Sequence, residues 1–242
     1  MWGMKQVESD LAAKADSGGD IEGDLVGEGL ACRRGGRLVF AGLDCRLPAG
    51  GALVLMGRNG SGKSSLLRVL ATLLAPEAGR LLWGGVPVGV DIARYRARIH
   101  YVGHLDATKP ALTSREMLCF WAALRGPAWR NPGGPAIDAA LEAFGLGAVA
   151  DWPCRWLSAG QRRRLALARL VAAPGPLWLL DEPAAALDGD GEARLAAAIA
   201  EHRAAGGRVA LATHQPIAMD GAAVIALDDF TASPDDALAA LW

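Results

Sequence analysis

The sequence predicts an α/β protein in which short buried strands alternate with helices around a parallel sheet. Residues 53–56 form an apolar segment that leads into a glycine-rich loop and then into a helical pattern over residues 65–74. Three further apolar segments typical of buried strands come late in the chain, at residues 177–180, 208–213 and 224–227. A helical pattern over residues 192–205 separates two of them. This alternation predicts helices on both faces of one sheet.

Composition limits the classes of function that need to be considered. The 242 residues suffice for a full core, and the formal net charge of −1 is spread without a run of one sign. Only 6% of residues are aromatic, so no basic–aromatic surface for nucleic acid is expected. The chain has no apolar stretch long enough to cross a membrane, so membrane residence would require a partner. The widely spaced cysteines predict reduced thiols and no metal site: Cys32, Cys45, Cys119 and Cys154.

Changes in composition along the chain predict three regions. Residues 1–28 are polar and rich in glycine and aspartate, which predicts a disordered leader. Residues 29–230 form the folded domain, and residues 231–242 a short tail. Strands are expected at residues 31–34, 38–47, 52–56, 80–83 and 99–102.

Residues 105–160 are expected to be mainly helical. Thr113 and Glu116 have the spacing of a capping box, which starts a helix. A Pro/Gly-rich loop over residues 126–135 and a second amphipathic helix should follow. In the first helix one apolar stripe is formed by Met117, Phe120, Trp121 and Leu124. Such a stripe is either core or a surface that receives a helix of a partner.

The glycine-rich loop is the most specific motif. It matches G-x-x-x-x-G-K-[ST] in full, between a strand and a helix, and comprises Gly57, Arg58, Asn59, Gly60, Ser61, Gly62, Lys63 and Ser64, with Ser65 directly after it. The backbone N–H groups of such a loop surround phosphate oxygens, the charge of Lys63 faces the β- and γ-phosphates, and the Ser64 hydroxyl can ligate Mg²⁺. The chain is therefore expected to bind a nucleoside triphosphate.

Two adjacent carboxylates end the strand at residues 177–180. Ligands of a parallel sheet collect at the carboxyl ends of its strands, so Asp181 and Glu182 should face the phosphate loop. Asp181 would hold Mg²⁺ through water, and Glu182 would polarise the water that attacks the γ-phosphate. The alternative is a surface acidic pair at a strand end.

A second helix start is also suited to an anion. Ser158 and Gln161 again have capping-box spacing, and Gly160 allows a phosphate to approach the backbone. A second anion site distant from the first makes sense if it closes over ATP held by another copy of the chain.

Together these motifs resemble the ATP-binding subunit of ABC transporters over residues 29–230. The resemblance implies a P-loop NTPase cassette with a RecA-like parallel-sheet core, an antiparallel β subdomain and an inserted helical subdomain at residues 105–160. It implies ATP hydrolysis with Mg²⁺ in a head-to-tail homodimer, where Ser158 and Gly160 face the partner's γ-phosphate. By the same resemblance, Lys63, Glu182 and His214 are catalytic, and Asp188 closes a D-loop that has Ala185 where serine is usual.

The chain departs from the family pattern at two places. His104 stands where a glutamine usually ligates Mg²⁺ and links to the membrane subunit, and imidazole can accept a water-mediated contact in that role. Arg33 or Arg34 falls where the family has an adenine-stacking tyrosine. A guanidinium plane can also stack on a base, which predicts binding with relaxed base selectivity.

Within the family, the chain resembles the ATP-binding subunit of the cytochrome c maturation (haem exporter) system. The resemblance is carried by Gly103 with His104, by Lys109, Leu112, Thr113 and Glu116, and by residues 157–169. It implies integral membrane partner subunits and a peripheral position at the cytoplasmic face of the cell inner membrane. ATP hydrolysis would then release haem from a periplasmic haem chaperone, without contact between the cassette and haem. The alternatives are an exporter of lipid, peptide or drug, and a soluble ABC ATPase clamp, which usually has coiled coils or two cassettes.

Overall fold

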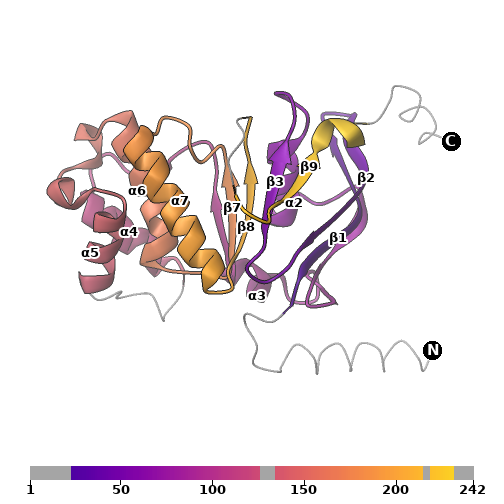
Figure 1. Cartoon of the computed structure of the whole chain (residues 1–242), viewed down its shortest axis with the longest axis horizontal. Coiled ribbons are helices and arrows are strands. Elements are labelled where there is room, and N and C mark those ends of the chain that lie inside the picture. The colour runs from indigo at the N-terminus through magenta and orange to yellow at the C-terminus, as the bar shows by residue number, and fades with distance from the viewer. Residues whose placement is uncertain (1–22, 126–133, 215–218, 232–242) are drawn as a thin grey trace.

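The computed structural model describes residues 23–125, 134–214 and 219–231. Two sheets and a group of helices make up an elongated molecule (Figure 1). The antiparallel sheet has the order β2-β1-β4-β5, with β1 (Leu25–Arg34), β2 (Arg37–Leu47), β4 (Ala78–Trp83) and β5 (Val86–Pro87). The second sheet has the order β6-β7-β8-β3-β9, with β3 (Ala52–Met56), β6 (Ile99–Val102), β7 (Leu177–Asp181), β8 (Arg208–Ala212) and β9 (Ala223–Ala226).

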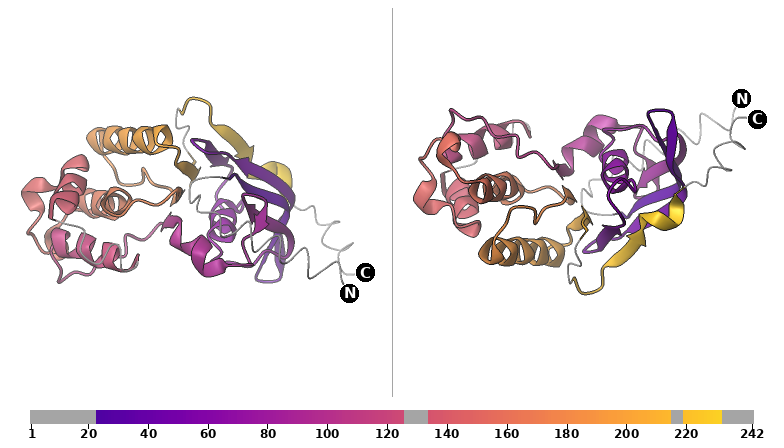
Figure 2. Two further views of the ribbon diagram at one scale, coloured as in Figure 1. Left: turned by 90° about the horizontal axis from the view of Figure 1, so that it is seen from below. Right: turned by 90° about the horizontal axis from the view of Figure 1, so that it is seen from above.

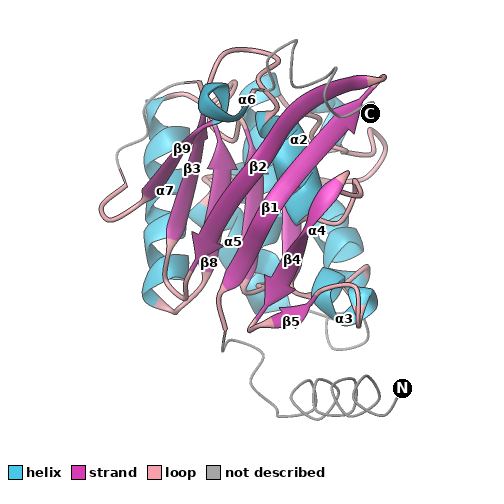
Figure 3. Cartoon of the chain, turned by 90° about the vertical axis from the view of Figure 1, so that its right-hand side faces the viewer, coloured by secondary structure: helices cyan, strands magenta, loops and turns pink. Residues whose placement is uncertain are grey.

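All pairs in the five-stranded sheet are parallel, as the alternation of strand and helix predicted. Its central strands are buried on both faces, which is why they read as continuous apolar segments. Alternate side chains of β7 enter two different cores. Leu177 and Leu179 pack with the antiparallel sheet and α2 (Lys63–Leu70), whereas Trp178 and Leu180 pack with the helical part of the molecule. Figure 3 shows α2 behind the antiparallel sheet.

The helical subdomain lies on the other side of the parallel sheet (Figure 2). It contains α4 (Ser114–Ala123), α5 (Gly134–Ala143) and two short 3₁₀ turns, η2 (Gly147–Val149) and η3 (Cys154–Trp156), and it leads into α6 (Ala159–Ala172). The capping box predicted at Thr113 is present. In the apolar stripe of α4, Met117 is core, whereas Phe120 and Trp121 are half-buried and Leu124 is exposed. Most of the predicted loop at 126–135 lies outside the described residues.

The remaining elements are α3 (Ile92–Ala97), α7 (Gly189–Ala204) and the 3₁₀ turn η4 (Leu227–Phe230). Among the helices that the structure describes, none combines the length and the hydropathy that crossing a membrane requires. The predicted tail is outside the described residues from position 232 onward.

The folded domain begins earlier than the sequence suggested. β1 starts at Leu25, so the expected boundary of the leader at residue 28 is wrong by a few residues, while residues 1–22 lie outside the described part. Leu25 is fully buried and pairs with Leu47 of β2 and Trp83 of β4. Glu28, which made this segment look like a polar leader, is at the surface in an ion pair with Arg80 (2.5 Å).

The helix after the phosphate loop is shorter than predicted, because it ends at Leu70 and not at residue 74. Thr72 takes the left-handed conformation with φ of 55°. Its N–H donates to the Val69 carbonyl at 2.9 Å, and the N–H of Leu73 donates to the Arg68 carbonyl at 2.8 Å. These two bonds form a Schellman motif that closes the helix without glycine, so the sequence carried no stop signal there.

Candidate functional site

The glycine-rich loop joins β3 to α2 at the carboxyl end of the parallel sheet. Gly57 has φ of 144° and Gly62 has φ of 108°, which are conformations that favour glycine. A Cβ on Gly57 would lie 2.6 Å from Oγ of Ser61, and one on Gly62 would lie 2.7 Å from Cγ1 of Val39. Both glycines are therefore required by conformation and by space, in agreement with a loop whose backbone amides turn inward.

Lys63 holds this loop together from inside. Its Nζ donates to the carbonyl oxygen of Gly57 at 2.6 Å and to that of Arg58 at 3.1 Å. The side chain is buried apart from a small exposed fraction. The ammonium is thus placed at the centre of the curl, where it can exchange these carbonyls for phosphate oxygens.

Asp228 on η4 contacts the same loop and was not identified from the sequence. Its Oδ2 accepts from the backbone N–H of Arg58 at 3.2 Å, and its Oδ1 lies 3.5 Å from the Arg58 guanidinium. An open cleft of about 550 Å³ runs here and is lined by Met56, Gly57, Arg58, Asn59, His214 and Asp228. The cleft connects the predicted phosphate loop to the predicted catalytic histidine.

Ser64 and Asp181 come together where Mg²⁺ is expected. Oγ of Ser64 donates to Oδ1 of Asp181 at 2.9 Å. Hydroxyl and carboxylate oxygens are the kind of group that Mg²⁺ takes in proteins, directly or through water. The described residues contain no cluster of three or more His, Cys, Asp or Glu side chains suited to a metal. This pair therefore fits an ion that takes its remaining ligands from phosphate and water.

Glu182 and His214 form a contact between neighbouring strands. Oε2 of Glu182 lies 2.9 Å from Nδ1 of His214. Since an ionised carboxylate only accepts, the ring donates from Nδ1 and keeps Nε2 for another partner. Glu182 has φ of 48°, a strained value for a residue other than glycine, and its N–H donates to the Ala212 carbonyl of β8 at 2.9 Å.

The helix start at Ser158 has the capping box that the sequence predicted. Oγ of Ser158 accepts from the N–H of Gln161 at 3.1 Å, and Oε1 of Gln161 accepts from the N–H of Ser158 at 2.8 Å. A Cβ on Gly160 would lie 3.1 Å from the Ala186 carbonyl oxygen. Asp188, predicted to bind nucleotide, accepts from the N–H of Gly191 at 2.9 Å and caps α7.

Not all predicted site residues meet in one protomer. The phosphate loop, Asp181, Glu182 and His214 gather at the carboxyl ends of β3, β7 and β8. Among the contacts given for the described residues, none joins Ser158 to the phosphate loop, and α2 and α6 lie on different sides of the parallel sheet (Figure 1). His104 is exposed on the turn after β6, and its predicted role as a magnesium ligand stays a prediction.

Arg163 connects these segments and was missed by the sequence analysis. It lies on α6, is 2% exposed, and donates to carbonyl oxygens of two segments. The acceptors after β7 are Asp181 (3.0 Å), Glu182 (2.7 Å) and Pro183 (3.1 Å), and that after β6 is Gly103 (2.9 Å), with the Asp106 carboxylate at 3.3 Å. Its place within a run of three arginines gave no signal that distinguished it from its neighbours.

The position expected to stack on a base carries no free ring. Burial raises the pKa of the Cys32 thiol, which hydrogen bonds with Ser65 and so places the end of β1 beside the phosphate loop. The next residue, Arg33, is held by Glu77 (3.3 Å) and by the Gly36 carbonyl oxygen (3.1 Å). The Arg33 guanidinium is therefore held by other partners, whereas Arg34, the last residue of β1, is exposed, and its predicted stacking on the base stays a prediction.

Curated relatives match nearly the whole chain. The cytochrome c biogenesis ATP-binding export protein CcmA of Rhodospirillum rubrum is 55% identical over 92% of this chain and 94% of its own length. The protein of the same name from Paramagnetospirillum magneticum is 56% identical over 85% of this chain and 94% of its own length. The resemblance inferred from the motifs is thus confirmed.

Solved structures support the fold class. An ABC transporter ATP-binding protein from Pyrococcus furiosus superposes with a TM-score of 0.76 at 22% identity, covering 86% of this chain and all of that one. A bacterial Atm1-family ABC exporter with ATP bound gives 0.69 at 21% identity, covering 80% of this chain and 34% of that one. The family model described as "ABC transporter" matches residues 40–185, more than half of the sequence. The chain therefore belongs to the ABC transporter ATP-binding family.

Proposed function

We propose that this chain is the ATP-hydrolysing subunit of a membrane ABC complex of the haem-exporter type. In such a complex, hydrolysis would drive release of haem from a periplasmic haem chaperone. The high identity to proteins named for cytochrome c biogenesis and export supports the assignment. The observation that carries the hydrolytic part is the contact between Glu182 and His214 beside a complete phosphate loop.

The residues of the site have separable roles in this proposal. The phosphate loop and Lys63 would bind the triphosphate. Ser64, and Asp181 through water, would hold Mg²⁺, which when bound would neutralise charge on the phosphate oxygens. Glu182 accepts a proton from the attacking water as general base. His214 fixes the Glu182 carboxylate through Nδ1 and, in its doubly protonated form, would also donate from Nε2 to a γ-phosphate oxygen.

A head-to-tail homodimer completes the reaction centre. The N-terminus of α6 is suited to an anion, and Ser158 and Gly160 would present it to the partner's γ-phosphate. Asp188 would lie at the same interface.

Membrane subunits would hold the dimer at the cytoplasmic face of the inner membrane, and the cassette itself would not touch haem. Such a subunit would dock at the apolar stripe of α4, where Leu124 is exposed and Phe120 and Trp121 are only partly covered by the chain's own core. Trp121→Asp should abolish co-purification with the membrane subunits and leave the affinity for ATP unchanged. Complex formation at the normal level would refute this placement.

The hydrolytic assignment is tested by two substitutions. Glu182→Gln should bind ATP, accumulate as a dimer on size-exclusion chromatography and lose hydrolysis, because the amide cannot accept the proton. Lys63→Ala should weaken ATP binding itself in a titration. Turnover of Glu182→Gln at the normal rate would show that another group is the base.

A further inference from the structure

We infer that Trp156 stacks on the adenine base of the ATP bound by the partner protomer. The inference rests on the head-to-tail dimer proposed above and concerns the base of the nucleotide, for which the sequence offered only an arginine, Arg33 or Arg34, and no aromatic ring. It starts from two observations. The strands beside the phosphate loop offer no exposed aromatic ring for the base, and the helical subdomain has an exposed tryptophan near Ser158.

The strands next to the phosphate loop, where the base of a bound nucleotide is expected, lack an exposed aromatic side chain. β1 and β2, which flank the loop there, contain a single aromatic residue, Phe40, and it is fully buried. Arg33 is held by Glu77 and Gly36, and the exposed Arg34 offers a guanidinium plane but no aromatic ring. Bases without an aromatic partner lose stacking, which is one of the main sources of affinity for a nucleobase.

The exposed ring is that of Trp156, which is 62% exposed and has no place in the core. It ends η3, two residues before Ser158. The Arg155 guanidinium lies 5.4 Å from its ring centroid, a cation–π contact that restrains the ring and leaves a cation beside it. A tryptophan kept at the surface in this way is suited to a flat ligand.

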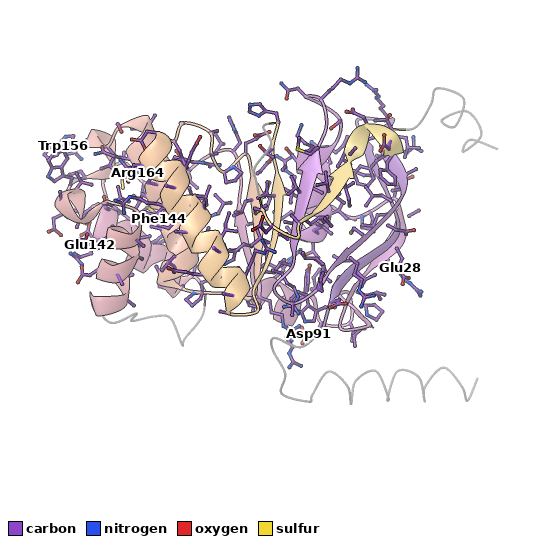
Figure 4. The ribbon with its side chains drawn as sticks, in the orientation of Figure 1. Glu28, Asp91, Glu142, Phe144, Trp156 and Arg164 are labelled. Atoms are coloured by element: carbon purple, nitrogen blue, oxygen red, sulfur yellow. The ribbon has the colours of Figure 1, made fainter. Side chains whose placement is uncertain are left out.

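Trp156 cannot serve the nucleotide of its own chain. Figure 4 shows Trp156 at one end of the long axis and Glu28 of β1 toward the other end. β1 borders the base end of the phosphate loop through the contact of Cys32 with Ser65. The ring therefore lies far from its own base position and can meet only a nucleotide held by another chain.

The backbone conformation between Trp156 and Ser158 determines how far the Trp156 ring lies from the helix start at Ser158. Leu157 is extended, with φ of −71° and ψ of 141°, so the Cα atoms of Trp156 and Ser158 are about 7 Å apart. If Ser158 contacts the γ-phosphate of the partner's ATP, an indole that extends beyond this span can reach past the triphosphate toward the base. Arg155 is then near the ribose and phosphates, where a cation is favourable.

The test uses the full chain in complex with its membrane subunits. Trp156→Ala should raise the KM for ATP about tenfold to a hundredfold, the loss expected for one stacked base, with little change in kcat. Trp156→Phe should recover part of the loss. Trp152→Ala is the matched control, because Trp152 is another exposed tryptophan of the helical subdomain (47% exposed), and it should leave the KM unchanged. Ribose 5′-triphosphate, which lacks the base, should show no effect of Trp156→Ala.

Three results would overturn the inference. They are equal effects of Trp156→Ala and Trp152→Ala, an equal rise of KM for ATP and for ribose 5′-triphosphate, and loss of the membrane subunits on purification of Trp156→Ala. The dimer is tested separately with Glu182→Gln. If ATP fails to dimerise that variant, the proposed shared site is wrong. If the variant does dimerise but Trp156→Ala leaves the KM for ATP unchanged, only the inference about Trp156 is contradicted.

Discussion

At the scale of single residues, Arg163 has the densest set of hydrogen bonds near the site. Its guanidinium joins the backbone on either side of Glu182 to the segment that carries His104. The Glu182 carbonyl also accepts from the N–H of Ala185 at 3.1 Å. Removing the guanidinium would still take one partner from each of these carbonyls and loosen the backbone around Glu182. Arg163 is thus a positioning residue for the predicted base.

Arg163→Met should lower kcat for ATP about tenfold to a hundredfold with little change in KM, because a small displacement of the base slows chemistry while the phosphate loop is untouched. Arg163→Lys, with fewer donors, should recover part of the rate. Arg164→Met is the control, since Arg164 contacts the Phe144 carbonyl and Asp190, away from the site. Steady-state hydrolysis by the assembled complex measures all three, and a rise in KM without loss of kcat would exclude this role.

At the scale of elements, α4 and α6 both begin with a capping box, but only α6 is proposed to face a phosphate. Thr113 starts α4 and Ser158 starts α6, each with a complete capping box. Ser158→Ala and Thr113→Ala should each lower the free energy of unfolding by about 1 kcal/mol in urea titrations. Only Ser158→Ala should also reduce ATP hydrolysis by the assembled complex, because only that helix is proposed to face a phosphate. Equal hydrolysis by the two variants would count against the shared site.

The sequence predicts elements well where the signal is local. The phosphate loop, the apolar strands and both capping boxes are each specified by neighbouring residues, and they are found as predicted. The end of α2 was missed because a Schellman motif centred on Thr72 replaces a glycine. Contacts of Arg163 and Asp228 link segments distant in sequence, so neither residue could be recognised before the chain was folded. The early start of β1 depends on partners in β2 and β4 in the same way.

At the scale of the whole molecule, the buried His100 and the partly buried His202 make stability depend on pH. Burial lowers the pKa of His100 to about 3, and the charge of Arg125 acts in the same direction. Burial also lowers the pKa of His202 to about 4, where the ring stacks on Trp178 at 3.9 Å between centroids. Both rings stay neutral in the folded state and take up protons near pH 6.5 when unfolded, so stability is lost as pH falls below that value.

Between pH 7 and pH 5 the loss should be about 2 kcal/mol for His100 and about 1 kcal/mol for the partly exposed His202. His202→Phe keeps an aromatic ring against Trp178 and removes the titration. Its free energy of unfolding should therefore fall by about 1 kcal/mol less than that of the unsubstituted chain over this range. Parallel curves from denaturant titrations at the two pH values would show that His202 does not contribute.

The placement of Glu182 and His214 has a consequence for timing. Glu182 directly follows β7, and His214 comes two residues after the end of β8. These two strands are paired, and paired strands lie about 4.8 Å apart. The acid–imidazole contact is therefore made by residues that follow two paired strands of one protomer. One protomer therefore supplies the paired carboxylate and imidazole by itself, which leaves the approach of the second protomer, with its Ser158, as the step that can trigger hydrolysis.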